Sequence, residues 1–243
     1  MSVTTEKNIV LHAADVIKNF GGLRALSDID LQIEEGKTHA IIGRIPPTSG
    51  AVVFDGTVLT GKAPHEINQL GISRVFQTPE IFADLSVLHN VMAPAFARRD
   101  GAFRLNMFRT TAREAAIRDE AESLLNDFGM WERRDDHSGA LSRGDKRRLE
   151  LCMCLIQHPR LLLLDEPTAG MSRHDTNTTI DLLKKIKQRG MTKVIIEHDM
   201  HGVFSLADKI SVLAQGRIIA SGLPQDIKED PRVQEAYLGG TVE

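Results

Sequence analysis

The stretch Leu161-Leu-Leu-Leu-Asp165-Glu166-Pro167 decides the architecture. A short apolar run closed by a proline turn predicts a strand that is buried on both faces, as in a parallel sheet covered by helices. The strand ends in two adjacent carboxylates. In such a place one carboxylate can hold Mg²⁺ and the other can activate a water molecule, although paired carboxylates also occur in ordinary solvated turns.

The composition limits the class of protein. The chain has 243 residues, enough for one domain with an inserted subdomain, and its formal net charge of −3 gives no reason to expect nucleic-acid binding. Cys152 and Cys154 lie two positions apart on a predicted helix and do not form a disulfide framework. We see no apolar signal segment and no run of the ~20 apolar residues that a bilayer requires. We therefore expect a soluble, cytoplasmic chain.

Strand and helix patterns alternate along the sequence. Runs typical of strands, separated by turns, are predicted at Ile9–Phe20, Ile29–Ile33, Thr38–Gly43, Ala51–Phe54 and Gly71–Gln77. Helices are predicted over Ala112–Phe128, from Gly144 to His158 and over Thr178–Arg189, with strands beginning at Leu161 and Val194. A final hairpin joins Lys209–Leu213 to Arg217–Ala220 across Gln215-Gly216. This alternation predicts an α/β fold with a parallel sheet.

The segment Val194-Ile-Ile-Glu-His198-Asp199 carries another candidate site residue. His198 follows an apolar strand, where a histidine can reach a γ-phosphate through a charge-assisted hydrogen bond. A solvated histidine at the end of a strand is the simpler interpretation. His198 and His201 could also form a metal pair at helical spacing, but no third ligand is evident.

The segment Leu141-Ser142-Arg143-Gly144-Asp145 precedes a helix that contains Arg147 and Arg148. A serine at a helix start is an ordinary cap, and the same hydroxyl with the first backbone N–H groups also forms an anion site. Gln77 could contact Mg²⁺ or water. Phe20 could stack on adenine or belong to the core. Each feature is weak by itself, and their order along the chain carries the argument.

In this order and spacing, the segments resemble the signature segment, the Walker B strand and the switch histidine of an ATP-binding-cassette (ABC) ATPase. The resemblance covers nearly the whole chain. It is nearest to importer subunits of the branched-chain amino-acid type, through Phe20-Gly-Gly-Leu-Arg-Ala-Leu, Pro47-Thr-Ser-Gly50, Asp165-Glu-Pro-Thr-Ala-Gly170 and Val233-Gln-Glu-Ala-Tyr-Leu-Gly239.

The resemblance implies a P-loop NTPase-like parallel sheet core with an N-terminal antiparallel β subdomain and an inserted helical subdomain. It implies a single nucleotide-binding domain over residues 1–243, with the core at 1–79 and 141–243 and the helical signature subdomain at 80–140. The expected ligands are ATP and Mg²⁺. The implied roles are nucleotide binding for Phe20, Gln77, Ser142 and Gly144, metal binding for Asp165 and Gln77, and catalysis for Glu166 and His198.

The resemblance also implies partners. Two ATPase subunits pair head to tail, so that the signature of one closes over the phosphates held by the other. Integral membrane permease subunits complete the transporter, which places the chain in the cytoplasm, peripheral on the inner face of the cell membrane. No nucleic-acid partner is expected.

The sequence departs from the family at the phosphate loop, because the motif G-x-x-x-x-G-K-[ST] does not occur in it. From Gly43 the chain continues as Arg44-Ile-Pro-Pro-Thr-Ser-Gly50, where a relative would have this loop and about two turns of helix, roughly fifteen residues more. No lysine lies between Gly43 and Gly50, and prolines lack the N–H donors of a phosphate cradle. Arg143 and Asp145 also depart from the common signature spelling Leu-Ser-Gly-Gly-Gln.

These observations predict the ATP-binding subunit of an ABC importer that couples ATP hydrolysis to uptake of an amino-acid-like solute. Its isolated chain should be inactive, and its activity should depend on an intact partner subunit. The alternative is a non-hydrolysing regulatory or binding subunit, which would show no partner-stimulated ATP turnover. A DNA-maintenance or translation factor of the same superfamily would be favoured by long coiled-coil insertions or a second cassette, and the sequence contains neither.

Overall fold

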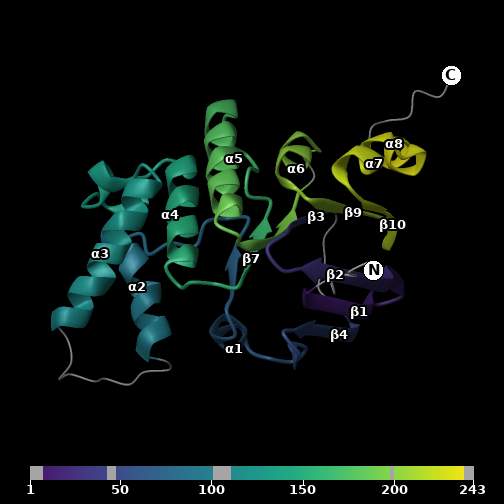
Figure 1. Cartoon of the computed structure of the whole chain (residues 1–243), viewed down its shortest axis with the longest axis horizontal. Coiled ribbons are helices and arrows are strands. Elements are labelled where there is room, and N and C mark those ends of the chain that lie inside the picture. The colour runs from purple at the N-terminus through teal and green to yellow at the C-terminus, as the bar shows by residue number, and fades with distance from the viewer. Residues whose placement is uncertain (1–7, 43–47, 101–110, 198–199, 238–243) are drawn as a thin grey trace, which may run out of the picture. The chain divides into compact units, whose positions relative to one another are not determined.

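The computed structural model describes residues 8–42, 48–100, 111–197 and 200–237, and the chain divides into two compact units (Figure 1). The first unit comprises Met1–Ile67 and Lys184–Glu243, and the second comprises Asn68–Leu183. The predicted division into a core and a helical subdomain at residues 80–140 stays a prediction. Within the described ranges, no helix is both long enough and apolar enough to span a bilayer.

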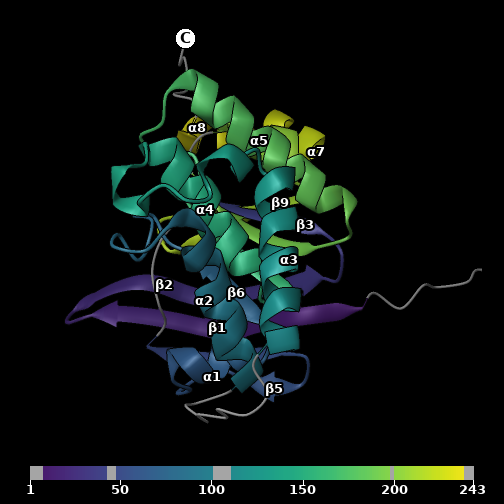
Figure 2. The same ribbon diagram turned by 90° about the vertical axis from the view of Figure 1, so that its left-hand side faces the viewer.

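An antiparallel sheet in the order β2-β1-β4-β5 forms part of the first unit. Its strands are β1 (Ile9–Phe20), β2 (Leu23–Glu34), β4 (Ser49–Phe54) and β5 (Thr57–Val58), and helix α1 (Pro64–Gln69) follows. Figure 2 shows β1 and β2 as long neighbouring strands. β2 begins well before the predicted Ile29, because pairing with β1 from Leu23 onward, rather than an apolar pattern, holds its first half in the sheet.

The first unit also contains strands in the order β10-β9-β3-β8. These are β3 (Thr38–Ile42), β8 (Thr192–Ile196), β9 (Lys209–Ala214) and β10 (Arg217–Gly222), with helices α6 (Met200–Leu206), α7 (Pro224–Glu229) and α8 (Pro231–Tyr237). β3 runs parallel to β8 and β9. The predicted hairpin between β9 and β10 is confirmed, with positive φ angles at Gln215 and Gly216 as a tight primed turn requires.

The second unit is mainly helical around a parallel strand pair. Its elements are β6 (Ile72–Val75), α2 (Val87–Asp100), α3 (Thr111–Asp127), the 3₁₀ turns η1 (Trp131–Arg133) and η2 (Ser138–Ala140), α4 (Arg143–Leu155), β7 (Leu161–Asp165) and α5 (Arg173–Gln188), whose end belongs to the first unit. Helices α2, α3 and α4 pack on one another (Figure 1). Leu161, Leu162 and Leu164 are fully buried, which confirms the strand that decided the architecture.

Two helix starts follow from side-chain caps. Ser142 caps α4, so Gly144 lies inside the first turn of the helix rather than before it. Ser172 accepts a hydrogen bond from the Asp175 backbone N–H at 3.2 Å, and α5 therefore begins at Arg173, ahead of the predicted Thr178. Cys152 and Cys154 are buried on α4 as free thiols.

His39 on β3 makes the stability of the fold dependent on pH. It is only 2% exposed, and its Nε2 lies 2.9 Å from Ser211 Oγ. Burial, assisted by the charge of Lys209 and opposed by that of Glu34, lowers its pKa from 6.5 to about 4. Between these values the unfolded chain binds a proton that the folded chain does not. The free energy of unfolding should therefore fall on acidification through this window, by up to about 3 kcal/mol.

The test is denaturant unfolding of the wild type and of His39→Gln at about pH 7.5 and about pH 4.5. The wild type should lose more stability between the two conditions than the variant, because only the wild type carries the buried imidazole. An equal loss in both proteins would contradict the assignment.

Candidate functional site

Asp165 closes β7 with one of its carboxylate oxygens in an ion pair. Arg74 Nη2, from the neighbouring parallel strand β6, donates to Asp165 Oδ2 at 2.9 Å. Among the described residues, Asp165 Oδ1 has no hydrogen-bond partner although it is buried. A buried carboxylate oxygen without a donor is unfavourable, and a bound cation would satisfy it. The geometry therefore fits Asp165 as a metal ligand.

Glu166 turns the chain away from the strand in an unusual conformation. Its φ is +46°, a left-handed value that non-glycine residues seldom adopt and that is often found at functional sites. Gln77 Nε2 donates to Glu166 Oε2 at 2.5 Å. The structure thus brings together Gln77 and Glu166, which lie far apart in the sequence.

A buried ion pair on α4 lies under the loop that carries Gln77. Arg147 and Glu150 are 1% and 3% exposed, and their Nη1 and Oε2 atoms are 2.8 Å apart. Burial raises the pKa of Glu150 and lowers the pKa of Arg147, and the attraction between the two charges opposes both shifts. From the sequence, Arg147 is predicted only as part of a basic helix. The available signal was an arginine and a glutamate three positions apart, within reach of each other on one helix.

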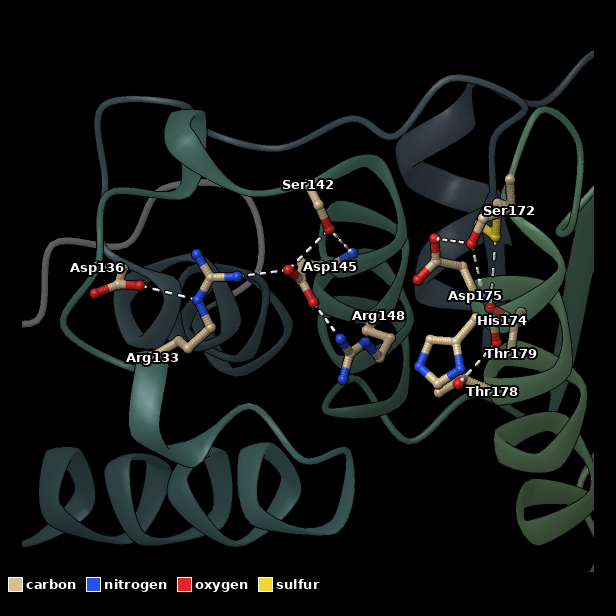
Figure 3. Close-up of polar contacts among 11 residues, drawn as sticks. Arg133, Asp136, Ser142, Asp145, Arg148, Ser172, His174, Asp175, Thr178 and Thr179 are labelled. Carbon is tan, nitrogen blue, oxygen red and sulfur yellow. Dashed lines mark hydrogen bonds and ion pairs between the residues drawn. The ribbon is translucent and has the colours of Figure 1, made fainter.

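The start of α4 holds a second polar network, drawn in Figure 3. Ser142 Oγ accepts from the Asp145 backbone N–H at 3.1 Å and donates to Asp145 Oδ2 at 2.8 Å. Arg133 and Arg148 form ion pairs with the two oxygens of Asp145 (Figure 3). Ser142 therefore does act as a helix cap, and the carboxylate beside it is balanced by two cations.

Gly144 is confined by α5. A Cβ atom added to Gly144 would lie 2.8 Å from Asp175 Oδ1, which is closer than such atoms approach. Asp175 itself accepts a hydrogen bond from Ser172 Oγ at 2.7 Å, so it is held in place (Figure 3). Gly144 is therefore buried against α5, and any larger residue at this position would displace the Asp175 side chain.

Phe20 is the last residue of β1, in the first unit. Its side chain is 51% exposed, so the interpretation as a core residue is wrong. Lys18 Nζ lies 4.7 Å from the ring centroid, a cation–π contact. His198 lies outside the described residues, and so does the side chain of His201.

In the part of the chain that the structure describes, no group of three or more His, Cys, Asp or Glu side chains could hold a metal ion. Mg²⁺ usually takes one or two carboxylates together with waters and phosphate oxygens. Asp165 supplies one such carboxylate.

Comparisons with known proteins identify the family. The protein-family model for the ABC transporter family matches residues 26–169. The family model for the branched-chain amino acid ATP-binding cassette transporter matches residues 217–243. The high-affinity branched-chain amino acid transport ATP-binding protein BraF of Pseudomonas aeruginosa is 31% identical over 249 residues, covering 95% of this chain and 98% of BraF. LivG of Escherichia coli, which has the same description, is 30% identical over 251 residues, again covering 95% and 98%.

Solved structures agree with this assignment and confirm the predicted fold class. The ADP conformation of MJ1267, an ATP-binding cassette of an ABC transporter, superimposes with a TM-score of 0.78 at 26% identity, covering 96% of this chain and 99% of that one. A nucleotide-free ATP-binding cassette from an ABC transporter gives the same TM-score and identity. The chain therefore belongs to the ATP-binding proteins of the ABC transporter family, in the branched-chain amino acid group.

Proposed function

We propose that the chain is the ATP-binding subunit of an ABC importer for branched-chain or similar amino acids, and that it works by completing the ATP site of an intact partner subunit. The similarity to BraF and LivG, which are branched-chain amino acid transport ATP-binding proteins, supports the transport role. The observation that carries the proposal is a contrast within the chain. The signature turn at Ser142 is fully built, whereas the sequence between His39 and Gly50 contains no G-x-x-x-x-G-K-[ST] loop.

The resemblance to ABC ATPases assigns five residues to the chain's own half of an ATP site: Phe20, Gln77, Asp165, Glu166 and His198. Asp165, with Gln77, would hold Mg²⁺, which when bound neutralises phosphate charge. Glu166 would orient the attacking water, Phe20 would stack on adenine, and His198 would contact the γ-phosphate. Without the loop there is neither a lysine nor a cradle of N–H groups for the phosphates, so this half-site should bind nucleotide weakly.

The signature half is the part offered to the partner. Ser142 and Gly144 lie at the start of a long helix, where backbone N–H groups favour an anion. Asp145 would repel a phosphate, but Arg133 and Arg148 neutralise it. We place this turn over the phosphates of a second ATPase subunit in a head-to-tail pair. Integral membrane permease subunits would then hold the pair at the inner face of the membrane.

A non-hydrolysing regulatory subunit is the second candidate. The pairing of Glu166 with Gln77, and of Asp165 Oδ2 with Arg74, favours it, because each carboxylate has one oxygen bonded to a side chain of the same chain. ATP turnover by the complex with its partner separates the two candidates. ATP turnover that depends on Ser142 supports the first candidate. A complex that binds ATP without hydrolysing it supports the second.

The isolated chain should bind Mg-ATP with a Kd of about 1 mM or weaker, because several charge-assisted hydrogen bonds to phosphate are absent and each 1.4 kcal/mol weakens binding about tenfold. Isothermal titration of the chain with Mg-ATP measures this affinity. Asp165→Asn is a suitable control and should change it little, since little Mg-ATP is held. Micromolar binding by the wild type would contradict the proposal.

A further inference from the structure

Folding stability alone does not explain why Arg147 and Glu150 form a buried ion pair. Both side chains are almost completely excluded from solvent. Removing two charges from water is unfavourable, and apolar side chains of similar volume often stabilise a core as well as a buried ion pair does. The contacts of the pair indicate a second role.

The pair holds the main chain on both sides of Gln77. Arg147 Nη1 donates to the Phe76 carbonyl, and Arg147 Nη2 donates to the Gln77 carbonyl at 2.9 Å. Glu150 Oε1 accepts from the backbone N–H of Phe76 at 3.0 Å and of Glu80 at 3.4 Å. β6 ends at Val75, so these backbone groups lie beyond the strand and take their partners from α4 instead.

The same guanidinium also reaches the backbone of Glu166, whose carboxylate is the candidate catalytic group. Arg147 Nη2 lies 3.5 Å from the Glu166 carbonyl, while the Gln77 side chain donates to the Glu166 carboxylate. α4 begins immediately after Ser142, about 8 Å along the helix axis from Arg147. One helix thus carries the signature turn at its start and the anchor of the Gln77 loop in its second turn.

We propose that Arg147 and Glu150 are positioning residues that fix the loop Phe76–Glu80 to α4, so that Gln77 and the signature residue Ser142 move as one body. The functional consequence rests on the proposed function, because it assumes that Ser142 completes the partner's ATP site. A displacement of the Gln77 loop would then reach the partner's phosphates through α4. Loss of the pair would lower turnover at the partner's site although Ser142 and Gly144 are intact.

The test uses the double variant Arg147→Met/Glu150→Leu, which replaces the pair with apolar side chains of similar volume and leaves no unpaired buried charge. The first readout is amide hydrogen exchange of the full chain. The N–H groups of Phe76 and Glu80 should exchange about tenfold faster or more, while amides of β7 keep their protection. The matched control is Arg118→Met/Glu122→Leu, which removes a surface pair of α3 and should leave both sets of amides unchanged.

The second readout is ATP turnover by the complete transporter with its intact partner subunit. The double variant should lower kcat about tenfold with little change in KM, because the nucleotide is held by the partner and only closure is impaired. A change in folding stability alone would not lower kcat while amide exchange in β7 and KM stay the same.

Each outcome has a defined meaning. Unchanged exchange at Phe76 and Glu80 would overturn the positioning role, whatever the turnover. Faster exchange with normal kcat would overturn the coupling to Ser142. If the wild-type complex shows no turnover that depends on Ser142, the proposed function fails, and the exchange result still decides whether the pair positions the loop.

Discussion

Insertion of a Gly-x-x-x-x-Gly-Lys-Thr loop with two turns of helix after Gly43 should tighten Mg-ATP binding by the isolated chain about a thousandfold or more. The new loop would add two or three hydrogen bonds between charged groups, each contributing about 1.5–3 kcal/mol, and about 4 kcal/mol corresponds to a thousandfold. The added helix would bury about three apolar side chains, a contribution of roughly 5–9 kcal/mol. The melting temperature should therefore rise as well.

Calorimetric titration and thermal unfolding of the repaired chain measure these two effects separately. A matched insertion with alanine in place of the loop lysine should recover the melting temperature but much less of the affinity. In the repaired chain Asp165→Asn should weaken binding in the presence of Mg²⁺, since Asp165 Oδ1 would then be a ligand. If the repaired chain binds Mg-ATP no tighter than the original, the arrangement of Gln77, Asp165 and Glu166 is not a nucleotide site.

In a complex with an intact partner, Ser142→Arg should abolish ATP turnover, whereas Glu166→Gln should change it little. The reason is the proposed division of labour. Ser142 lies at the exposed start of α4 and would meet the partner's phosphates, so a long side chain there blocks closure. Glu166 would face the half-site of its own chain, and the sequence of that half-site lacks a phosphate loop. Phosphate release at steady state measures both variants.

Controls distinguish a blocked approach from a weakened helix. Ser142 also caps α4, and loss of a cap destabilises a protein by about 1 kcal/mol. Ser142→Ala removes the same cap without adding bulk, so it should retain more turnover than Ser142→Arg. Replacing the partner's own Walker B glutamate should silence the complex. If Glu166→Gln silences it while Ser142→Arg is tolerated, the assignment of roles is reversed.

The elements that could be predicted from sequence were those with a strong local pattern. Leu161–Asp165 is apolar throughout and forms a buried strand, and Gln215-Gly216 supplies the backbone angles of a hairpin. α2 was not predicted as a helix, because its apolar residues lack a helical period and Pro94 interrupts them. The start of α5 was placed too late, although Ser172 and Asp175 have the spacing of a cap.

The two candidate carboxylates could be predicted from the sequence. The arginines that surround them could not. Asp165 and Glu166 are adjacent in the chain, so a strand-end pattern reveals them. Arg74 and Arg147 act through contacts between distant segments, and no sequence spacing specifies that a guanidinium bonds to the carbonyl of Gln77. The burial of Arg147 in particular runs against the general rule that arginine is exposed.

The buried thiols of α4 carry a consequence for chemical reactivity. Burial raises the pKa of Cys152 and Cys154, so the thiolate, which is the form that attacks alkylating reagents, is scarce in the native state. Either sulfur can react only when the helix opens. The two thiols therefore act as internal reporters of how often the helix that carries the signature turn comes apart, at positions that leave its first turn untouched.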